Sequence, residues 1–346
     1  MRTLNPPSAL LTAIAMLSLA TGNSPAQPTA TVPVACMTYP VTSGARSSFG
    51  VPLFDLPIRT GFASTVTSNT IGVTDVNWTP NQFAVAGAAY FVAIRTGPQA
   101  GRTLLVVGNT SNTLTLDVED TPLDTAGFAV SAGTDSIELF QGDTLGSLFG
   151  TSANASGILA TGVKGGTTTQ NADNIQLYEG SGFVTYFFNT TVGAWVRNGG
   201  GTTNRNGLIL YPDDGMLITR RGPTGSLTFS GRVPSTRLLT KFPGGTTNVM
   251  TVRFPADTTL GGLNFGAPGT WLAGSSASVA DTVSVWSGSN WVVYYKNLSN
   301  QWLRSNGNGG DQSALVIRSG TSIRIVKRGS ATGSTAYFSQ ALPYGL

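Results

Sequence analysis

A long internal repeat is the feature of this sequence that most restricts its fold. The stretch ADNIQLYEGSGFVTYFFNTTVGAWVRN (172–198) matches ADTVSVWSGSNWVVYYKNLSNQWLRS (280–305), and with one residue deleted Trp195 falls on Trp302. The match continues, because GLILYPDDGMLITRRG lies on ALVIRSGTSIRIVKRG in a constant register. The repeated unit is about as long as a domain, which is too long for the unit of a solenoid. The sequence therefore predicts two homologous domains in tandem.

The composition predicts strands rather than helices. Charged residues make up only 10% of the chain, so its polar surface must come from Ser, Thr, Asn and Gly, which favour turns. The 44 glycines follow no collagen period and indicate turns and bulges. We expect an all-β protein with two tandem β-sandwich-like domains and a smaller N-terminal β-barrel or sandwich domain.

The N-terminal region leaves two arrangements open. We divide the chain into a signal peptide at 1–26, an N-terminal β region at 27–142, a first repeat at 143–240 and a second repeat at 241–346. However, NVMTVRFP (248–255) has its better counterpart in SSFGVPLF (47–54), far upstream of the first repeat. In the alternative arrangement, the first repeat begins near residue 40 and residues 63–142 are an insert.

The N-terminus has the features of an export signal. Arg2 precedes the apolar run ALLTAIAMLSLA (9–20), which is too short to span a bilayer, and we place cleavage after Ala26. A lipoprotein anchor on Cys36 is not favoured, because this cysteine lies far from the apolar run. No other long apolar run exists, so we expect secretion through the general export pathway to the periplasm, the cell surface or the medium.

The missing residue types exclude several kinds of chemistry. The chain has no histidine, which removes the commonest general base and the usual Ser-His-Asp and Cys-His nucleophile systems. A single cysteine cannot form a disulfide or a cysteine zinc site within one chain. The net charge of +4 is scattered rather than arranged in a basic stripe, so we expect no nucleic-acid partner.

Several stretches between residues 40 and 234 resemble a known family. They include VPLF, TSNTIGV, WTPNQFAV, GNTSNTLTLD, DTLGSLFG and DDGMLITRRG. On these stretches the chain resembles exported, β-rich proteins of unknown function that occur in many copies in Verrucomicrobium-like bacteria. The resemblance implies an exported β protein, and it assigns no catalytic residue. The second repeat, beyond residue 240, is an addition to the usual pattern of that family.

The aromatic hairpins are candidates for ligand binding. Aromatic rings on one strand face could stack on sugars, whereas the alternative is packing within and across the hairpin. We favour packing, because Phe183 is replaced by Trp291, and Phe188 by Lys296, in the second copy. The candidate ligand-binding residues are Tyr178, Phe183, Trp195, Trp286, Trp291, Tyr295 and Trp302.

Acidic residues form the other candidate sites. The segment LDVEDTPLD carries oxygen ligands of the type that Ca²⁺ takes, but without the spacing of an EF-hand. We favour a polar strand face and turn, and we expect no cofactor, with Ca²⁺ as the alternative. Asp213-Asp214-Gly215 reads as a turn, and Asp173 and Asp281 are expected to cap or position a turn. The candidate calcium ligands are Asp117, Glu119, Asp120 and Asp124.

These observations favour a structural or adhesive protein of the cell surface or extracellular matrix, without catalytic activity. Duplicated domains with uncharged polar surfaces suit many weak contacts. Surface polysaccharide or other envelope proteins are the expected partners. The alternatives are a carbohydrate-binding module protein and a glycan hydrolase that uses carboxylates alone, which requires two acids about 5–10 Å apart in one cleft.

Overall fold

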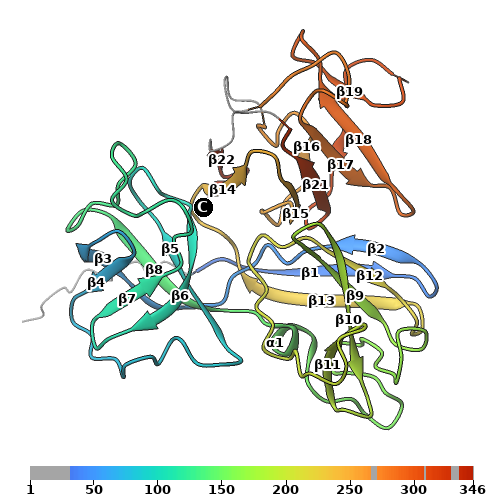
Figure 1. The fold of residues 1–346 in the computed structure, drawn as a ribbon, viewed down its shortest axis with the longest axis horizontal. Helices are drawn as coiled ribbons and strands as arrows, with labels where there is room; N and C mark the ends of the chain where they lie inside the picture. The colour runs from blue at the N-terminus through green and yellow to red at the C-terminus, as the bar shows by residue number, and fades with distance from the viewer. Residues whose placement is uncertain (1–31, 266–270, 308, 329–334, 346) are drawn as a thin grey trace, which may run out of the picture. The chain divides into compact units, whose positions relative to one another are not determined.

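The protein is all-β, as the composition predicts. Its structure is a computed structural model that describes residues 32–265, 271–307, 309–328 and 335–345. The predicted signal peptide at 1–26 lies outside the described residues. Within the described part, the regular structure is almost entirely β-strand, and α1 (Leu145–Phe149) is a short helix capped by Thr144 (Figure 1). None of the helices described has the length and apolar character that a membrane crossing requires.

The first sandwich is built from segments that lie far apart in the sequence. A five-stranded sheet has the order β11-β10-β9-β12-β2, and β1 pairs with β13 in a second sheet. Figure 1 shows the blue strands β1 and β2 beside the yellow and green strands of residues 174–232. The strands are β1 (Val34–Val41), β2 (Arg46–Phe49), β9 (Asn174–Glu179), β10 (Gly182–Asn189), β11 (Ala194–Arg197), β12 (Met216–Thr219) and β13 (Gly225–Arg232).

The second sandwich has the same strand order. Its five-stranded sheet runs β15-β21-β17-β18-β19, and β14 pairs with β22. The register is also the same, since Phe49 faces Met216 in the first sandwich and Met250 faces Ile323 in the second. The strands are β14 (Leu238–Pro243), β15 (Thr247–Thr251), β16 (Thr258–Thr259), β17 (Thr282–Trp286), β18 (Trp291–Lys296), β19 (Trp302–Arg304), β20 (Val316–Ile317), β21 (Ser322–Val326) and β22 (Thr335–Gln340).

A closed six-stranded barrel lies, in chain order, between β2 and α1 of the first sandwich. Its order is β3-β4-β7-β6-β5-β8, and closure removes the exposed sheet edges that promote aggregation. The first strand begins at Pro57, upstream of residue 63, where the sequence hypothesis places the start of an insert. The strands are β3 (Pro57–Val66), β4 (Thr70–Val73), β5 (Ala89–Ile94), β6 (Thr103–Asn109), β7 (Thr113–Leu116) and β8 (Ser136–Gly142).

A buried carboxylate organises the core of the first sandwich. Asp173, at 0% exposure just before β9, forms an ion pair with Arg220, which follows β12. Its Oδ2 also accepts a hydrogen bond from the backbone of Lys164 (2.8 Å), and its Oδ1 accepts from the backbones of Arg221 (2.5 Å) and Gly222 (2.9 Å). One side chain therefore joins a loop to two neighbouring strands, and its charge is compensated.

The second sandwich repeats this arrangement with a different cation. Asp281, also fully buried, forms an ion pair with Lys327. Its Oδ2 accepts from the backbone of Leu272 (2.8 Å) and its Oδ1 from the backbone of Arg328 (2.6 Å). The ammonium of Lys327 also lies 5.2 Å from the centre of the Trp271 ring, which stabilises a buried cation.

The two sandwiches contact each other through equivalent segments. Residues 213–215 hydrogen-bond to 249–251, and the equivalent residues 320–322 hydrogen-bond to 49–50. A Cβ atom at Gly50 would lie only 2.2 Å from a side-chain atom across this contact, so the close approach requires glycine. Each repeat thus uses the same surface patch to contact the other repeat, as the subunits of a two-fold symmetric dimer do.

We predict that Asp173→Asn lowers the free energy of unfolding by about 3–5 kcal/mol, because it leaves Arg220 buried without its counter-charge. Urea denaturation monitored by tryptophan fluorescence measures this loss. Asp124→Asn, at an exposed position in the barrel, is the matched control and should change the value by less than about 0.5 kcal/mol. Equal stability of the two variants would contradict the role given to the ion pair.

Candidate functional site

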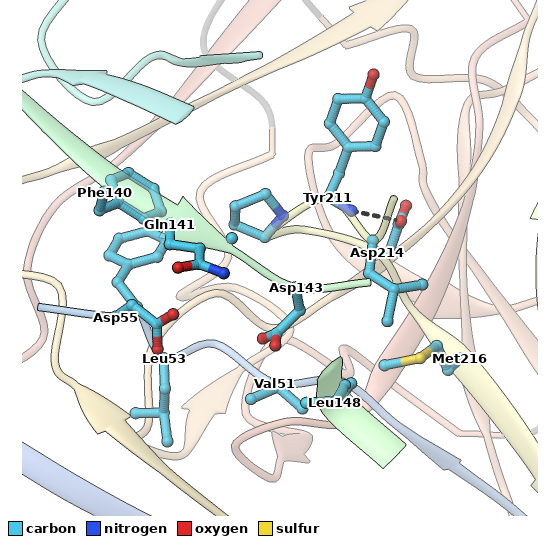
Figure 2. Close-up of a pocket in the computed structure, with 14 residues that line it drawn as sticks. Val51, Leu53, Asp55, Phe140, Gln141, Asp143, Leu148, Tyr211, Asp214 and Met216 are labelled. Carbon is cyan, nitrogen blue, oxygen red and sulfur yellow. Dashed lines mark hydrogen bonds between the residues drawn. The ribbon is translucent and has the colours of Figure 1, made fainter. Parts of the chain in front are cut away.

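Three aspartates line a small cavity at the base of the barrel (Figure 2). Asp55 lies just before the first barrel strand, Asp143 just after the last, and Asp214 precedes β12 of the first sandwich. The cavity has a volume of about 30 Å³, and its walls are otherwise mainly apolar. This volume accommodates about one or two water molecules, which is too little for a sugar or peptide substrate.

Burial changes the acidity of these aspartates. Burial raises the pKa of Asp143 to about 6, and the nearby charge of Asp55 contributes to the increase. The hydroxyl of Ser147 donates to Asp143 Oδ1 (3.1 Å), and this hydrogen bond lowers the pKa of Asp143. Burial likewise raises the pKa of Asp214 to about 7, with a further contribution from Asp213. These carboxyls therefore exchange protons near neutral pH.

Two members of this group have no signal in the sequence. Asp55 and Asp143 lie 88 positions apart, and no local motif connects them. The insertion of the barrel between them brings both to one cavity. Asp214 was interpreted as a turn residue, and its Oδ2 does accept a turn hydrogen bond from the backbone of Tyr211 (2.8 Å).

A larger cavity, the junction pocket, adjoins the first. It has a volume of about 550 Å³ and shares Tyr211, Pro212 and Asp214 with the smaller cavity. Its walls come from β6 of the barrel, from residues 211–214 of the first sandwich, and from β14 and β15 of the second. The volume lies within the usual range of small-molecule sites, roughly 300–1,000 Å³.

Four of the predicted ligand-binding aromatics contact one another. Phe183 stacks on Trp291 with ring centres 6.4 Å apart, although the two belong to different sandwiches. Tyr178 packs edge-on against Phe183 (5.4 Å), and Trp286 packs edge-on against Trp291 (5.3 Å). The indole nitrogen of Trp286 also donates to the Arg46 carbonyl (3.4 Å). These half-buried rings join equivalent hairpins of the two repeats.

The remaining three aromatics lie elsewhere. Trp195 and Trp302 are 0% and 1% exposed, at equivalent places in the two cores, so neither ring has a free face for a ligand. The indole nitrogen of Trp195 donates to the carbonyl of Gly150 (2.9 Å). Tyr295 is half-buried on β18, and its hydroxyl is 3.5 Å from the carbonyl of Ser275. The seven residues therefore do not form one platform.

The predicted calcium ligands are held by protein contacts. Glu119 and Asp120 both form ion pairs with Lys241 of β14 in the second sandwich. Asp117 accepts a hydrogen bond from the backbone of Glu119 (3.1 Å), and Asp124 is exposed. Among the described residues, no group of three or more acidic or cysteine side chains is close enough to hold a metal ion. The ammonium group of Lys241 thus lies where the calcium hypothesis places Ca²⁺.

Comparison with known proteins adds no assignment to this geometry. No family model, curated protein or solved structure matches the chain. The resemblance to exported β-rich proteins therefore stays a prediction, and the function has to be argued from the chain's own residues.

We predict that Trp291→Ala lowers the free energy of unfolding by about 1–3 kcal/mol, because it removes the ring that joins the two repeats. Tyr295→Ala, on the same strand, is the matched control and should cost less. Urea denaturation measures both. If Trp291 instead served only as a ligand platform, the two variants would be equally stable.

The raised aspartate pKa values predict a pH dependence. An aspartate in the unfolded chain has a pKa near 4, so the folded state binds these protons more tightly. This contribution to stability is fully present below about pH 4 and is lost as the pH rises toward 7. At about 1.4 kcal/mol per pKa unit, we expect Asp143→Asn and Asp214→Asn each to reduce this loss of stability by roughly 3–4 kcal/mol. Unfolding curves at several pH values check this, and an unchanged slope in both variants would contradict it.

Proposed function

We propose that the protein is an exported structural or adhesive component of the cell surface or extracellular matrix, and that it acts without catalysis. One observation carries the proposal: the barrel and both sandwiches share a single apolar cluster. The cluster packs the three modules against one another, and a structural component of the cell surface needs such contacts between its modules. Its buried members are Phe54, Ala89, Phe91, Ala93, Phe140, Leu238 and Phe254.

Polar contacts support the same rigid arrangement. Glu138 of the barrel, buried, forms ion pairs with Arg232 of β13 (2.8 Å) and Arg95 (3.2 Å). Arg237, between the sandwiches, donates to the carbonyls of Ala100 (2.9 Å) and Pro98 (2.9 Å) in the barrel. Because Arg232 comes from the first sandwich, separating the modules would remove this buried guanidinium from its carboxylate.

The position of the acidic groups supports a role without catalysis. Two carboxyls have the acidity of a general acid or base. Asp143 lines only the cavity of about 30 Å³, whereas Asp214 lines both this cavity and the junction pocket. A glycan hydrolase needs its acids on both sides of a bound sugar. The small cavity leaves no room for a sugar beside Asp143, which supports a role for Asp143 without catalysis.

We expect antibodies raised against the purified chain to label intact cells of the organism that encodes it. The physical reason is the predicted N-terminal export signal combined with a weakly charged surface suited to repeated contacts. Deletion of the gene should reduce cell–cell or cell–surface attachment, and the wild-type gene should restore it. A cytoplasmic protein is the labelling control. Labelling only after lysis, in the cytoplasmic fraction, would contradict the proposal.

A further inference from the structure

We propose that the junction pocket is a binding site for a short, neutral saccharide. This inference goes beyond the structural role, and of the seven hairpin aromatics only Tyr178 lines the pocket. The pocket lies where the barrel meets both sandwiches, and its volume of about 550 Å³ suits a small ligand. Three features of its lining point to a ligand rich in hydroxyl groups.

The first feature is a pair of hydroxyl groups without partners. Thr103 Oγ1, on β6, and Tyr337 Oη, on β22, are both buried and both belong to residues that line the pocket. Neither has a hydrogen-bond partner among the described residues. Buried polar atoms in proteins are almost always hydrogen-bonded. Both atoms are almost fully covered by protein, so a ligand in the pocket pairs with them after a small side-chain movement exposes them.

The second feature is a lining with charges of both signs. Arg253 is buried, and its Nη1 donates to Thr240 Oγ1 (2.9 Å) at the wall of the pocket. Burial lowers the pKa of Arg253, whereas the nearby charge of Asp213 raises it. The positive side chains in the lining are Arg102, Lys241 and Arg253, and the acidic ones are Asp117, Glu119, Asp213 and Asp214.

This balance of charges selects against ions. An anion would meet the aspartates and a cation would meet the arginines, so either would be repelled by part of the wall. A neutral saccharide is suited to both, since each hydroxyl can donate to a carboxylate and accept from a guanidinium. Hydrogen bonds to charged groups are also stronger than those between neutral groups.

The third feature is a set of aromatic rings positioned by their neighbours. Tyr337 packs against Phe128 with ring centres 4.9 Å apart, and Tyr178 is positioned by Phe183. Both tyrosines line the pocket together with Tyr211. Rings that are already held in place lose little entropy when an apolar sugar face packs on them. The lining thus combines apolar faces with directional polar groups.

The test is binding of defined saccharides to the purified full chain by calorimetry and thermal shift. The probes are the neutral trisaccharides maltotriose, cellotriose, xylotriose and chitotriose, with trigalacturonate as an anionic probe. We expect at least one neutral probe to bind and trigalacturonate not to bind. Thr103→Val and Tyr337→Phe preserve shape and remove only the hydroxyl, so each should weaken binding about fivefold.

Two controls separate binding from folding. Tyr295→Phe removes a tyrosine hydroxyl outside the pocket and should leave the affinity unchanged. Without saccharide, Thr103→Val and Tyr337→Phe should melt at the wild-type temperature or higher, because they remove hydroxyls that have no protein partner among the described residues. The proposal is overturned if no neutral probe binds, if trigalacturonate binds instead, or if both pocket variants bind as the wild type does. A lower melting temperature for both variants without saccharide would likewise overturn it.

Discussion

Each sandwich depends on one interaction, the ion pair between its buried aspartate and a cationic side chain. Asp173 and Asp281 each receive a cationic side chain and backbone N–H groups in a site without solvent. A buried, unpaired charge is strongly unfavourable, so the loop, the strand start and the strand end that supply the partners must come together. Replacement of Arg220 by Lys327 preserves the charge while its surroundings change from carbonyls to aromatic rings. The charge pair is therefore the constant element of both repeats.

The repeat also explains how the chain builds a junction without a second copy. Equivalent segments meet across the contact between the sandwiches, and the stacked rings of Phe183 and Trp291 occupy equivalent positions. In a symmetric dimer such positions must carry identical residues, but within one chain they can diverge. In chain order, the barrel lies between β2 and α1 of the first sandwich. The junction pocket results from this asymmetry, because the barrel contributes one wall of it.

Periodicity and duplication predicted much of the fold. Alternating strands and Gly-rich turns indicated an all-β protein, which the structure confirms. The alignment places Trp195 on Trp302, and both side chains are buried. Strand alternation does not distinguish buried from half-buried aromatic residues, because both kinds occupy alternate positions along a strand. It also gave no sign that Glu119 and Asp120 meet Lys241, which is distant in sequence. Charge partners of this kind depend on how whole modules pack.

The sequence by itself determined the class of fold and the residue types from which any site must be made, including the absence of histidine. Local propensity and side-chain alternation suffice for the class of fold, since they act over a few neighbouring residues. Only the tertiary structure decided which polar groups became core, junction or pocket. The aspartates at 55, 143 and 214 meet because a closed barrel returns the chain close to its starting point. Such encounters depend on long-range packing, which no short stretch of sequence encodes.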